Sequence, residues 1–370
     1  MKKIVVIGAG ILGASAAYHL AKMGAEVTII DRKDAGQATE AAAGIICPWL
    51  SQRRNKAWYE LAKSGAAYYE QLIPTLEQEG ETATGYKKVG ALSLHTDDKK
   101  IEQMEKRAID RRVEAPEIGD IRMLTAVETS AQMPILDEIY QSIEISGGAR
   151  VNGRALRDAL LRSAEKHGAV RLDGSAKIEL IEGRRVIVVA NEQQFQADAV
   201  VVAAGAWAKE LFSPLNIDLQ VGAQKAQIAH LQVTDEHTGE WPVVMPPNNQ
   251  YMLAFDDGEI VVGATYEDHI DNLDVTVGGL HEIFDKALSV ASKLQYAEFK
   301  EAKIGFRPFT PNFMPVIGVV PTLEHVYFAN GLGSSGLTVG PFLGSQLAKL
   351  ALEETPDLDL TPYDVAQILS

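Results

Sequence analysis

The chain has a single cysteine, fewer basic than acidic residues and no long apolar run. Its single cysteine, Cys47, cannot form an internal disulfide, which favours a reducing compartment, and we expect the cytoplasm. With 35 basic against 50 acidic residues, the net charge of −15 argues against a nucleic acid or membrane-surface partner. No apolar stretch approaches the roughly 20 residues that a membrane helix needs. The eight histidines are scattered without the spacing of metal ligands, so we expect no metal.

The strongest local pattern occupies residues 4–31. An apolar strand, a GxGxxG turn, an amphipathic helix and a second strand that ends in an acid follow one another there. Gly8 permits the sharp turn, Gly10 leaves space for a pyrophosphate, and Gly13 lets the helix pack close to the sheet. The pattern predicts a dinucleotide site, in which the phosphates lie at the helix start and the acid accepts hydrogen bonds from ribose. Besides the three glycines, the residues of this segment expected to contact the dinucleotide are Ile11, Leu12, Asp31 and Arg32.

Two other interpretations of this segment are open from the motif alone. Lys2 and Lys3 before an apolar run resemble a secretory signal peptide, but its hydrophobic region would contain three glycines and His19. A nicotinamide dehydrogenase would explain the glycines equally well, although Asp31 would repel the 2′-phosphate of NADP. No second GxGxxG follows, so a flavoprotein with this sequence would take its electrons directly from substrate.

The length of 370 residues predicts two domains or lobes. The wholly apolar segment 197–205 is typical of a strand inside a parallel sheet, and the alternation over 219–265 predicts a β-rich block. Periodicity predicts helices at 57–79, 99–112, 126–133, 153–167, 280–294 and 338–352, and strands at 86–94, 170–172, 177–180, 184–189, 194–197 and 325–329. The expected fold class is α/β, with a Rossmann-like lobe interleaved with an α+β lobe built on a mainly antiparallel sheet.

Three further segments carry a family pattern when they are taken together with the opening glycines. They are ATEAAAGII, ADAVVVAAGAWA, and GFRPFTPNFMPVIG followed by NGLGSSGLTVGP. The chain resembles the FAD-dependent D-amino acid oxidase superfamily, within it the glycine oxidase and sarcosine oxidase branch, and the resemblance covers nearly all of its length. It implies an FAD-binding domain from 1–85, 145–220 and 305–370, and a substrate-binding domain from 86–144 and 221–304.

The resemblance also implies a set of cofactor contacts beyond the first turn. Small residues of the connector and of the late strand would lie along the flavin and its pyrophosphate, and the final glycine-rich turn would stabilise negative charge on the flavin ring. These residues are Thr39, Ala42, Ala43, Gly44, Ile45, Ala176, Ala203, Ala204, Gly205, Trp207, Gly331, Gly333, Ser334, Ser335, Gly336, Leu337 and Thr338. Cys47 lies far from the GFRP segment, where sarcosine oxidase-like relatives attach FAD, so the cofactor is expected to be non-covalent.

For substrate, the resemblance implies that Arg307 and Tyr251 hold a carboxylate. A guanidinium has the planar fork that matches a carboxylate, and the neighbours of Arg307 are apolar. Ile45 would face the reaction site, and Tyr266 and His269 are further pocket candidates. Tyr251 could equally be a buried tyrosine satisfied by backbone, and Arg307 could form a surface ion pair.

The predicted activity is the oxidation of a small amino acid or N-alkyl amino acid, of the glycine, sarcosine or D-amino acid class, by hydride transfer to flavin N5. Oxygen or another acceptor would then reoxidise the flavin. The strand matching the oxygen-activating lysine of sarcosine oxidase-like proteins has only Glu259 to Val262, so a quinone-linked D-amino acid dehydrogenase stays open. Alternatives of another class are an NAD-dependent dehydrogenase and a non-catalytic flavin-binding module. The expected partner is a small amino acid or amine, and a homo-oligomer is left open.

Overall fold

The opening segment folds into a parallel β–α–β unit. In the computed structural model, which describes residues 1–234, 237–268 and 272–369, these elements are β1 (Lys3–Ile7), α1 (Ile11–Lys22) and β2 (Glu26–Asp31). β1 lies between β2 and β13 (Ala199–Val202), and it is parallel to both. The sheet continues to β9 (Val170–Asp173) on one side and to β21 (Val326–Asn330) and β20 (Val316–Val319) on the other. Only the edge pair β20–β21 is antiparallel in this part of the described chain.

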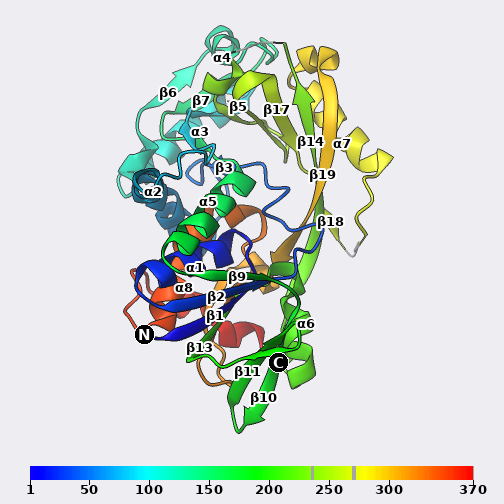
Figure 1. Cartoon of the computed structure of the whole chain (residues 1–370). Coiled ribbons are helices and arrows are strands. Elements are labelled where there is room, and N and C mark those ends of the chain that lie inside the picture. Colours follow the sequence, from blue (N-terminus) through cyan, green and yellow to red (C-terminus); the bar gives the residue numbers. More distant parts are fainter. Residues whose placement is uncertain (235–236, 269–271, 370) are drawn as a thin grey trace.

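This sheet is covered on both faces, which is why β1 and β13 are apolar at successive positions. Ile4 and Val6 belong to the core formed with α1, α5 (Gly153–Lys166) and α8 (Gly336–Ala351). Val5 and Ile7 point the other way, into a core shared with β10 (Ala176–Glu182), β11 (Arg185–Ala190) and β12 (Gln193–Phe195). Figure 1 shows this lobe in the lower half of the view, with the ends of the chain in it.

The second lobe is built on a mainly antiparallel sheet, in the upper half of Figure 1. Its strands are β5 (Ala91–His95), β6 (Ile121–Leu124), β7 (Gln141–Ile145), β14 (Gly222–Gln232), β15 (Val243–Met245), β16 (Tyr251–Ala254), β17 (Glu259–Gly263), β18 (Glu267–Asp268) and β19 (Glu298–Phe309). The pair β15–β5 is parallel. Its separate core includes Leu92, Leu231 and Val262. The mixed α/β fold class is confirmed.

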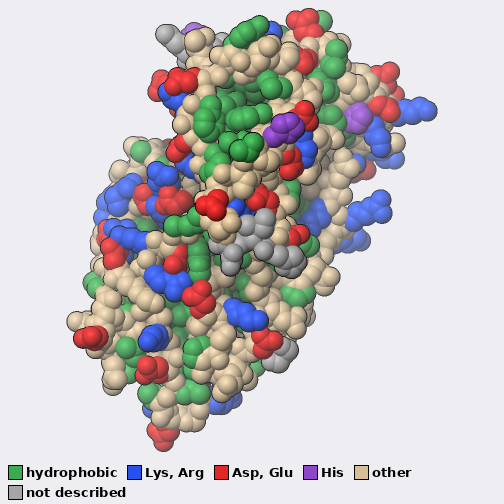
Figure 2. Space-filling view, turned by 90° about the vertical axis from the view of Figure 1, so that its right-hand side faces the viewer, with side chains coloured by type: hydrophobic (Ala, Val, Ile, Leu, Met, Phe, Trp, Pro, Cys, Tyr) green, Lys and Arg blue, Asp and Glu red, His purple; other side chains and the backbone are tan. Residues whose placement is uncertain are grey.

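The remaining elements connect and cover the two sheets. A small sheet joins β3 (Ile45–Ile46), β8 (Ala149–Arg150) and β4 (Lys87–Lys88). The other helices are α2 (Lys56–Gln78), α3 (Asp98–Arg112), α4 (Ala126–Gln132), α6 (Ala208–Phe212) and α7 (Val277–Leu288). Within the described ranges no helix is both long and apolar enough to span a bilayer. Figure 2 shows acidic and basic side chains interspersed over one face of the molecule.

Two details differ from the sequence-based expectations. The helix predicted over 280–294 is wrong at its end, because α7 stops at Leu288 and a separate 3-10 turn follows at Ser292–Tyr296. The charged segment before the GFRP motif is a long strand, β19, which pairs with β14 along its length. The domain boundary placed between 304 and 305 therefore falls inside a strand, and the assignment of segments to two domains stays a prediction.

Candidate active site

A cavity of about 900 Å³ is lined by segments from both lobes. It lies at the carboxyl ends of β1 and β13, the edge of a parallel sheet at which α/β proteins bind their ligands. Its volume is at the upper end of the range for small-molecule sites, as an extended dinucleotide requires. The other walls come from the connector 37–48, the loop before β16, the end of β19 and the start of α8.

The structure brings almost all of the predicted site residues together around this cavity. Of the predicted substrate residues, Arg307, Tyr251, Tyr266 and Ile45 line it. Of the predicted cofactor residues, all line it except Gly13 and Gly331. A Cβ at Gly13 would lie 1.9 Å from the carbonyl oxygen of Gly8, so this glycine permits the close packing of helix on turn. His269 lies outside the described residues.

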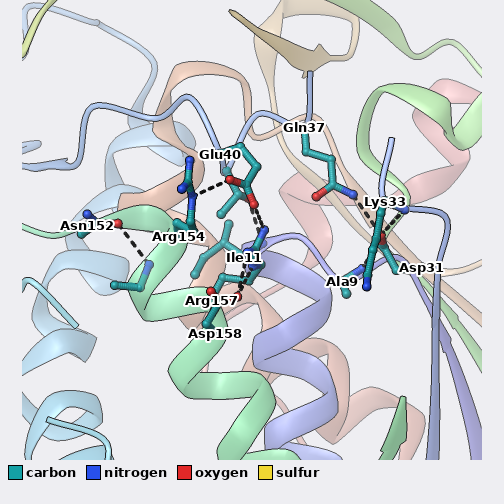
Figure 3. A network of polar contacts seen from close by, with 12 residues as sticks. Ala9, Ile11, Asp31, Lys33, Gln37, Glu40, Asn152, Arg154, Arg157 and Asp158 are labelled. Atoms are coloured by element: carbon teal, nitrogen blue, oxygen red, sulfur yellow. Dashed lines mark hydrogen bonds and ion pairs between the residues drawn. The ribbon is translucent and has the colours of Figure 1, made fainter. Parts of the chain in front are cut away.

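Asp31 lines this cavity and is held in place by the hydrogen bonds drawn in Figure 3. Its Oδ2 accepts a hydrogen bond from the amide of Ala9 at 2.6 Å. Its Oδ1 accepts from the amide of Lys33 at 2.6 Å and from Nε2 of Gln37 at 3.0 Å. A carboxylate has about four lone-pair positions, so these contacts leave capacity for one ribose hydroxyl.

The connector is fixed to two helices. Oγ1 of Thr39 accepts from the amide of Ile11 at 3.0 Å, at the start of α1. Glu40 pairs with Arg154 at 2.6 Å and with Arg157, both on α5 (Figure 3). Burial alone would raise the pKa of Glu40, but the two guanidinium groups lower it below its usual value. These contacts hold the small residues 41–44 against the cavity.

Three glycines leave space that the protein itself does not use. A Cβ built on Gly205 or Gly336 would meet no protein atom within 4 Å, and one on Gly333 would meet only the carbonyl oxygen of Pro308 at 4.0 Å. All three residues line the cavity. Gly205 and Gly333 also have positive φ angles of 53° and 54°, which favour glycine whatever the space, whereas Gly336 has a helical φ of −52° and neither packing nor backbone conformation accounts for its lack of a side chain. Their placement fits a flavin cofactor lying against the end of β13 and the start of α8.

Arg307 lines the same cavity, next to two tyrosines. Its Cζ is 4.9 Å from the centre of the Tyr266 ring, and its Nη1 donates to the carbonyl oxygen of Thr265 at 3.4 Å. Burial raises the pKa of Tyr251 to about 12, and the positive charge of Arg307 acts in the opposite direction. The hydroxyl of Tyr251 is therefore a neutral hydrogen-bond donor at ordinary pH. Together with a partly buried guanidinium, it suits an anionic substrate group.

The loop that carries Tyr266 is supported by a buried lysine. Nζ of Lys225, whose side chain is fully buried, donates to Oδ1 of Asn272 and to the carbonyl oxygen of Asp274, both at 2.8 Å. It also lies 3.8 Å from Oε2 of Glu267. Glu267 in turn accepts from the hydroxyl of Thr265 at 2.6 Å. The network fixes the backbone to which Arg307 donates.

Cys47 lines the cavity but is 7% exposed, and burial raises the pKa of its thiol to about 12. A thiol with such a pKa is protonated and unreactive at neutral pH. This environment is consistent with the expectation of a non-covalent cofactor.

Sequence reasoning missed several residues of the site. Arg53 and Trp58, with the Arg53 Cζ 4.7 Å from the indole ring, follow the connector in a segment without a motif. Gln250 lines the cavity beside Tyr251, and its amide atoms are buried without a partner in the described structure. Arg53 and Gln250 are lone polar residues in loops, and Trp58 is an aromatic residue of α2 outside any motif, so only the fold could identify these three.

Comparisons with known proteins agree with this geometry. "Uncharacterized oxidoreductase YurR" of Bacillus subtilis is 58% identical over the full length of both chains. The glycine oxidase of Pseudomonas aeruginosa is 28% identical over 98% of each. The crystal structure of iminodiacetate oxidase (IdaA) from Chelativorans sp. BNC1 matches with a TM-score of 0.95, 42% identity and 98% coverage of both chains.

The family model for FAD dependent oxidoreductases matches residues 3–350. This match excludes the nicotinamide interpretation of the first motif and confirms FAD as the cofactor. The chain belongs to the family of FAD dependent oxidoreductases and is an enzyme of the amino acid oxidase type.

Proposed function

We propose that this protein oxidises a small amino acid, primary or N-alkylated, to an imine that water then hydrolyses. One observation carries the proposal: Arg307 and Tyr251 converge on the same cavity as the glycine cradle of the cofactor. Among the described residues no carboxylate pairs with Arg307, which contacts a carbonyl oxygen, an aromatic ring and the hydroxyl of Tyr251. An unpaired guanidinium in a cofactor pocket is suited to an anionic substrate.

The relatives support the same substrate class. A glycine oxidase is similar over almost the whole chain, and the more similar iminodiacetate oxidase is named for a substrate with a secondary amine. We therefore favour an N-substituted glycine over glycine itself. A reducing compartment, consistent with the single cysteine, is part of the proposal.

FAD, when bound, supplies the acceptor for a hydride from the carbon next to the amine. The protein has to hold the carboxylate, which Arg307 and Tyr251 do in this proposal, and to exclude bulk water from the apolar face at Ile45. That chemistry would break the C–H bond, carry its electron pair away as the hydride, and form the C=N bond from the lone pair of the neutral amine. The amine proton goes to solvent, so no protein base is needed, in keeping with a described lining that contains no histidine.

The test is product analysis with purified holoenzyme. Glycine, sarcosine and iminodiacetate are each incubated in air, and glyoxylate, amine and oxygen consumption are measured. We expect glyoxylate from at least one compound, with the amine released in equal amount. No glyoxylate and no flavin reduction with any of them would contradict the proposal.

The same experiment addresses the electron acceptor. Oxygen consumption that matches glyoxylate formation identifies an oxidase. Glyoxylate that forms only after a soluble quinone is added identifies the dehydrogenase alternative. In both cases the substrate half of the proposal stands.

A further inference from the structure

A second cavity of about 370 Å³ adjoins the first. The two share the lining residues Tyr266, Arg307, Leu332, Gly333, Ser334 and Ser335, so they meet beside the substrate guanidinium. The other lining residues of the smaller cavity are Arg53, Gln224, Phe309, Asn312 and Phe313. Its described lining therefore contains two arginines and no acid.

Arg53 is partly buried in this wall, and its charge is not neutralised there. Its Nη2 donates to the carbonyl oxygen of Phe313 at 2.6 Å, and its Cζ lies over the ring of Trp58. Burial lowers the pKa of Arg53, and no carboxylate among the described residues offsets that effect. A guanidinium has five N–H donors, and no contact in the described structure uses Nε or Nη1.

The backbone and ring contacts of Arg53 hold its planar group in one orientation. Trp58 is itself fixed, because its Nε1 donates to Oγ of Ser335 at 3.2 Å, in the turn shared by both cavities. A guanidinium that is positioned, partly desolvated and left with free donors is arranged to bind an anion. Arg53 and Arg307 line this same small cavity, so an anion bound there could contact either guanidinium.

We propose that this cavity receives a second carboxylate, so that the substrate is a small amino acid with two carboxylates. The first carboxylate lies between Arg307 and Tyr251, and the second binds Arg53. This inference rests on the proposed function, since it places the reacting amine beside the cofactor. The second carboxylate can be carried on the amine nitrogen, as in iminodiacetate, or on the side chain, as in aspartate.

The first test uses wild-type holoenzyme and two ethers that cannot form an imine. Oxydiacetate has the shape of iminodiacetate, and methoxyacetate has the shape of sarcosine and lacks the second carboxylate. Titration calorimetry measures both dissociation constants without turnover. We expect oxydiacetate to bind about tenfold or more tightly than methoxyacetate. Equal affinities would overturn the inference.

The second test compares Arg53→Met with Arg54→Met. Arg54 is exposed and lines neither cavity, so its substitution removes the same charge at an adjacent position. We expect Arg53→Met to reduce the affinity ratio of oxydiacetate to methoxyacetate by about tenfold or more and Arg54→Met to leave the ratio unchanged. A lower melting temperature with an unchanged ratio would make Arg53 a structural residue only. If Arg53→Met does not fold, the affinity ratio of oxydiacetate to methoxyacetate is measured in Arg53→Lys instead. That ratio and the wild-type ratio then test the second carboxylate site.

Anaerobic flavin reduction distinguishes the two positions of the second carboxylate. Faster reduction by iminodiacetate than by sarcosine places it on the nitrogen, and faster reduction by D- or L-aspartate than by the matching alanine places it on the side chain. If no compound reduces the flavin, the proposed function fails, while the binding ratio still tests the second carboxylate site. If sarcosine and alanine reduce as fast as their dicarboxylate counterparts, the second carboxylate site fails and the proposed function stands.

Discussion

The Cζ of Arg307 lies 4.9 Å from the centre of the Tyr266 ring, and Nη1 of the same arginine donates to the carbonyl oxygen of Thr265, the residue before that tyrosine. Two adjacent residues of one loop therefore contact this guanidinium, one through its ring and the other through its carbonyl oxygen. Neither contact neutralises its charge, which leaves Arg307 free to pair with a substrate carboxylate.

Substitution of Arg307 tests this role directly. Arg307→Ala should lower kcat/KM, because the substrate carboxylate loses its partner. The corresponding loss of transition-state stabilisation should equal the strength of a charge-assisted pair, about 1.5–3 kcal/mol. Arg307→Lys should recover part of the loss, since it keeps the charge but not the fork. FAD content, measured from the flavin absorbance, should stay at the wild-type level in both variants. Kinetics unchanged from wild type in Arg307→Ala would remove the assignment.

Two glycines of the cofactor site should respond in opposite ways to a side chain. Gly336→Val places a side chain where the protein has no atom within 4 Å, so we expect unchanged stability of the apoprotein and a loss of FAD affinity of about tenfold or more. Gly13→Ala places a Cβ 1.9 Å from the carbonyl oxygen of Gly8, and we expect it to lower the free energy of unfolding by about 1–3 kcal/mol. Urea unfolding of apoprotein and FAD titration separate the two effects. Tight FAD binding by Gly336→Val would show that the cofactor lies elsewhere.

Most of the first lobe could be predicted from sequence, because its signals are local. The strand, glycine turn and helix of residues 4–31 are adjacent in the chain, and the predicted helix at 153–167 has a local cap in Asn152, which accepts from the amide of Ala155 at 3.0 Å. β19 could not be predicted in the same way. Its first half is rich in charged residues, among them Glu298, Lys300 and Glu301, and its place in the sheet depends on pairing with β14, far away in sequence.

The role of Arg53 in the smaller cavity could not be predicted from sequence for a related reason. Arg307 stood in a recognisable motif, whereas Arg53 is one of two adjacent arginines in a polar loop. Which of the two faces a cavity depends on how the loop lies against residues 312–314, and that contact spans about 260 positions of the chain. Nothing local in the sequence distinguishes Arg53 from Arg54.

The buried lysine of the substrate lobe gives a stability prediction. Lys225→Met removes the charge that faces Glu267 and the donor to Asn272, and it leaves a half-buried carboxylate with less compensation. We expect the free energy of unfolding to fall by about 3 kcal/mol, measured by urea denaturation. Lys300→Met, an exposed position on β19, serves as the control and should change it little. Equal effects of the two substitutions would show that the network does not order the loop.

His19 predicts a pH dependence of stability. Burial lowers its pKa from 6.5 to about 4, helped by the charges of Lys22 and Lys349, and its Nε2 lies 2.7 Å from the hydroxyl of Tyr68. The folded state therefore keeps His19 neutral where the unfolded state binds a proton. This residue's contribution to stability is complete above pH 6.5 and is lost as the pH falls toward 4, at up to about 1.4 kcal/mol per pH unit.

Urea unfolding of wild type and His19→Gln between pH 7 and pH 4 checks this expectation. The variant should show a smaller decline than wild type over that range, because glutamine does not titrate. Parallel pH profiles would mean that His19 titrates normally in the folded protein.

The most direct test of the proposed activity is anaerobic titration of the yellow holoenzyme with glycine, sarcosine and iminodiacetate. The account predicts that at least one of them bleaches the flavin absorbance in wild type, with iminodiacetate the most effective, and that Arg307→Ala requires a much higher concentration for the same bleaching. A flavin that stays oxidised with all three compounds would contradict it.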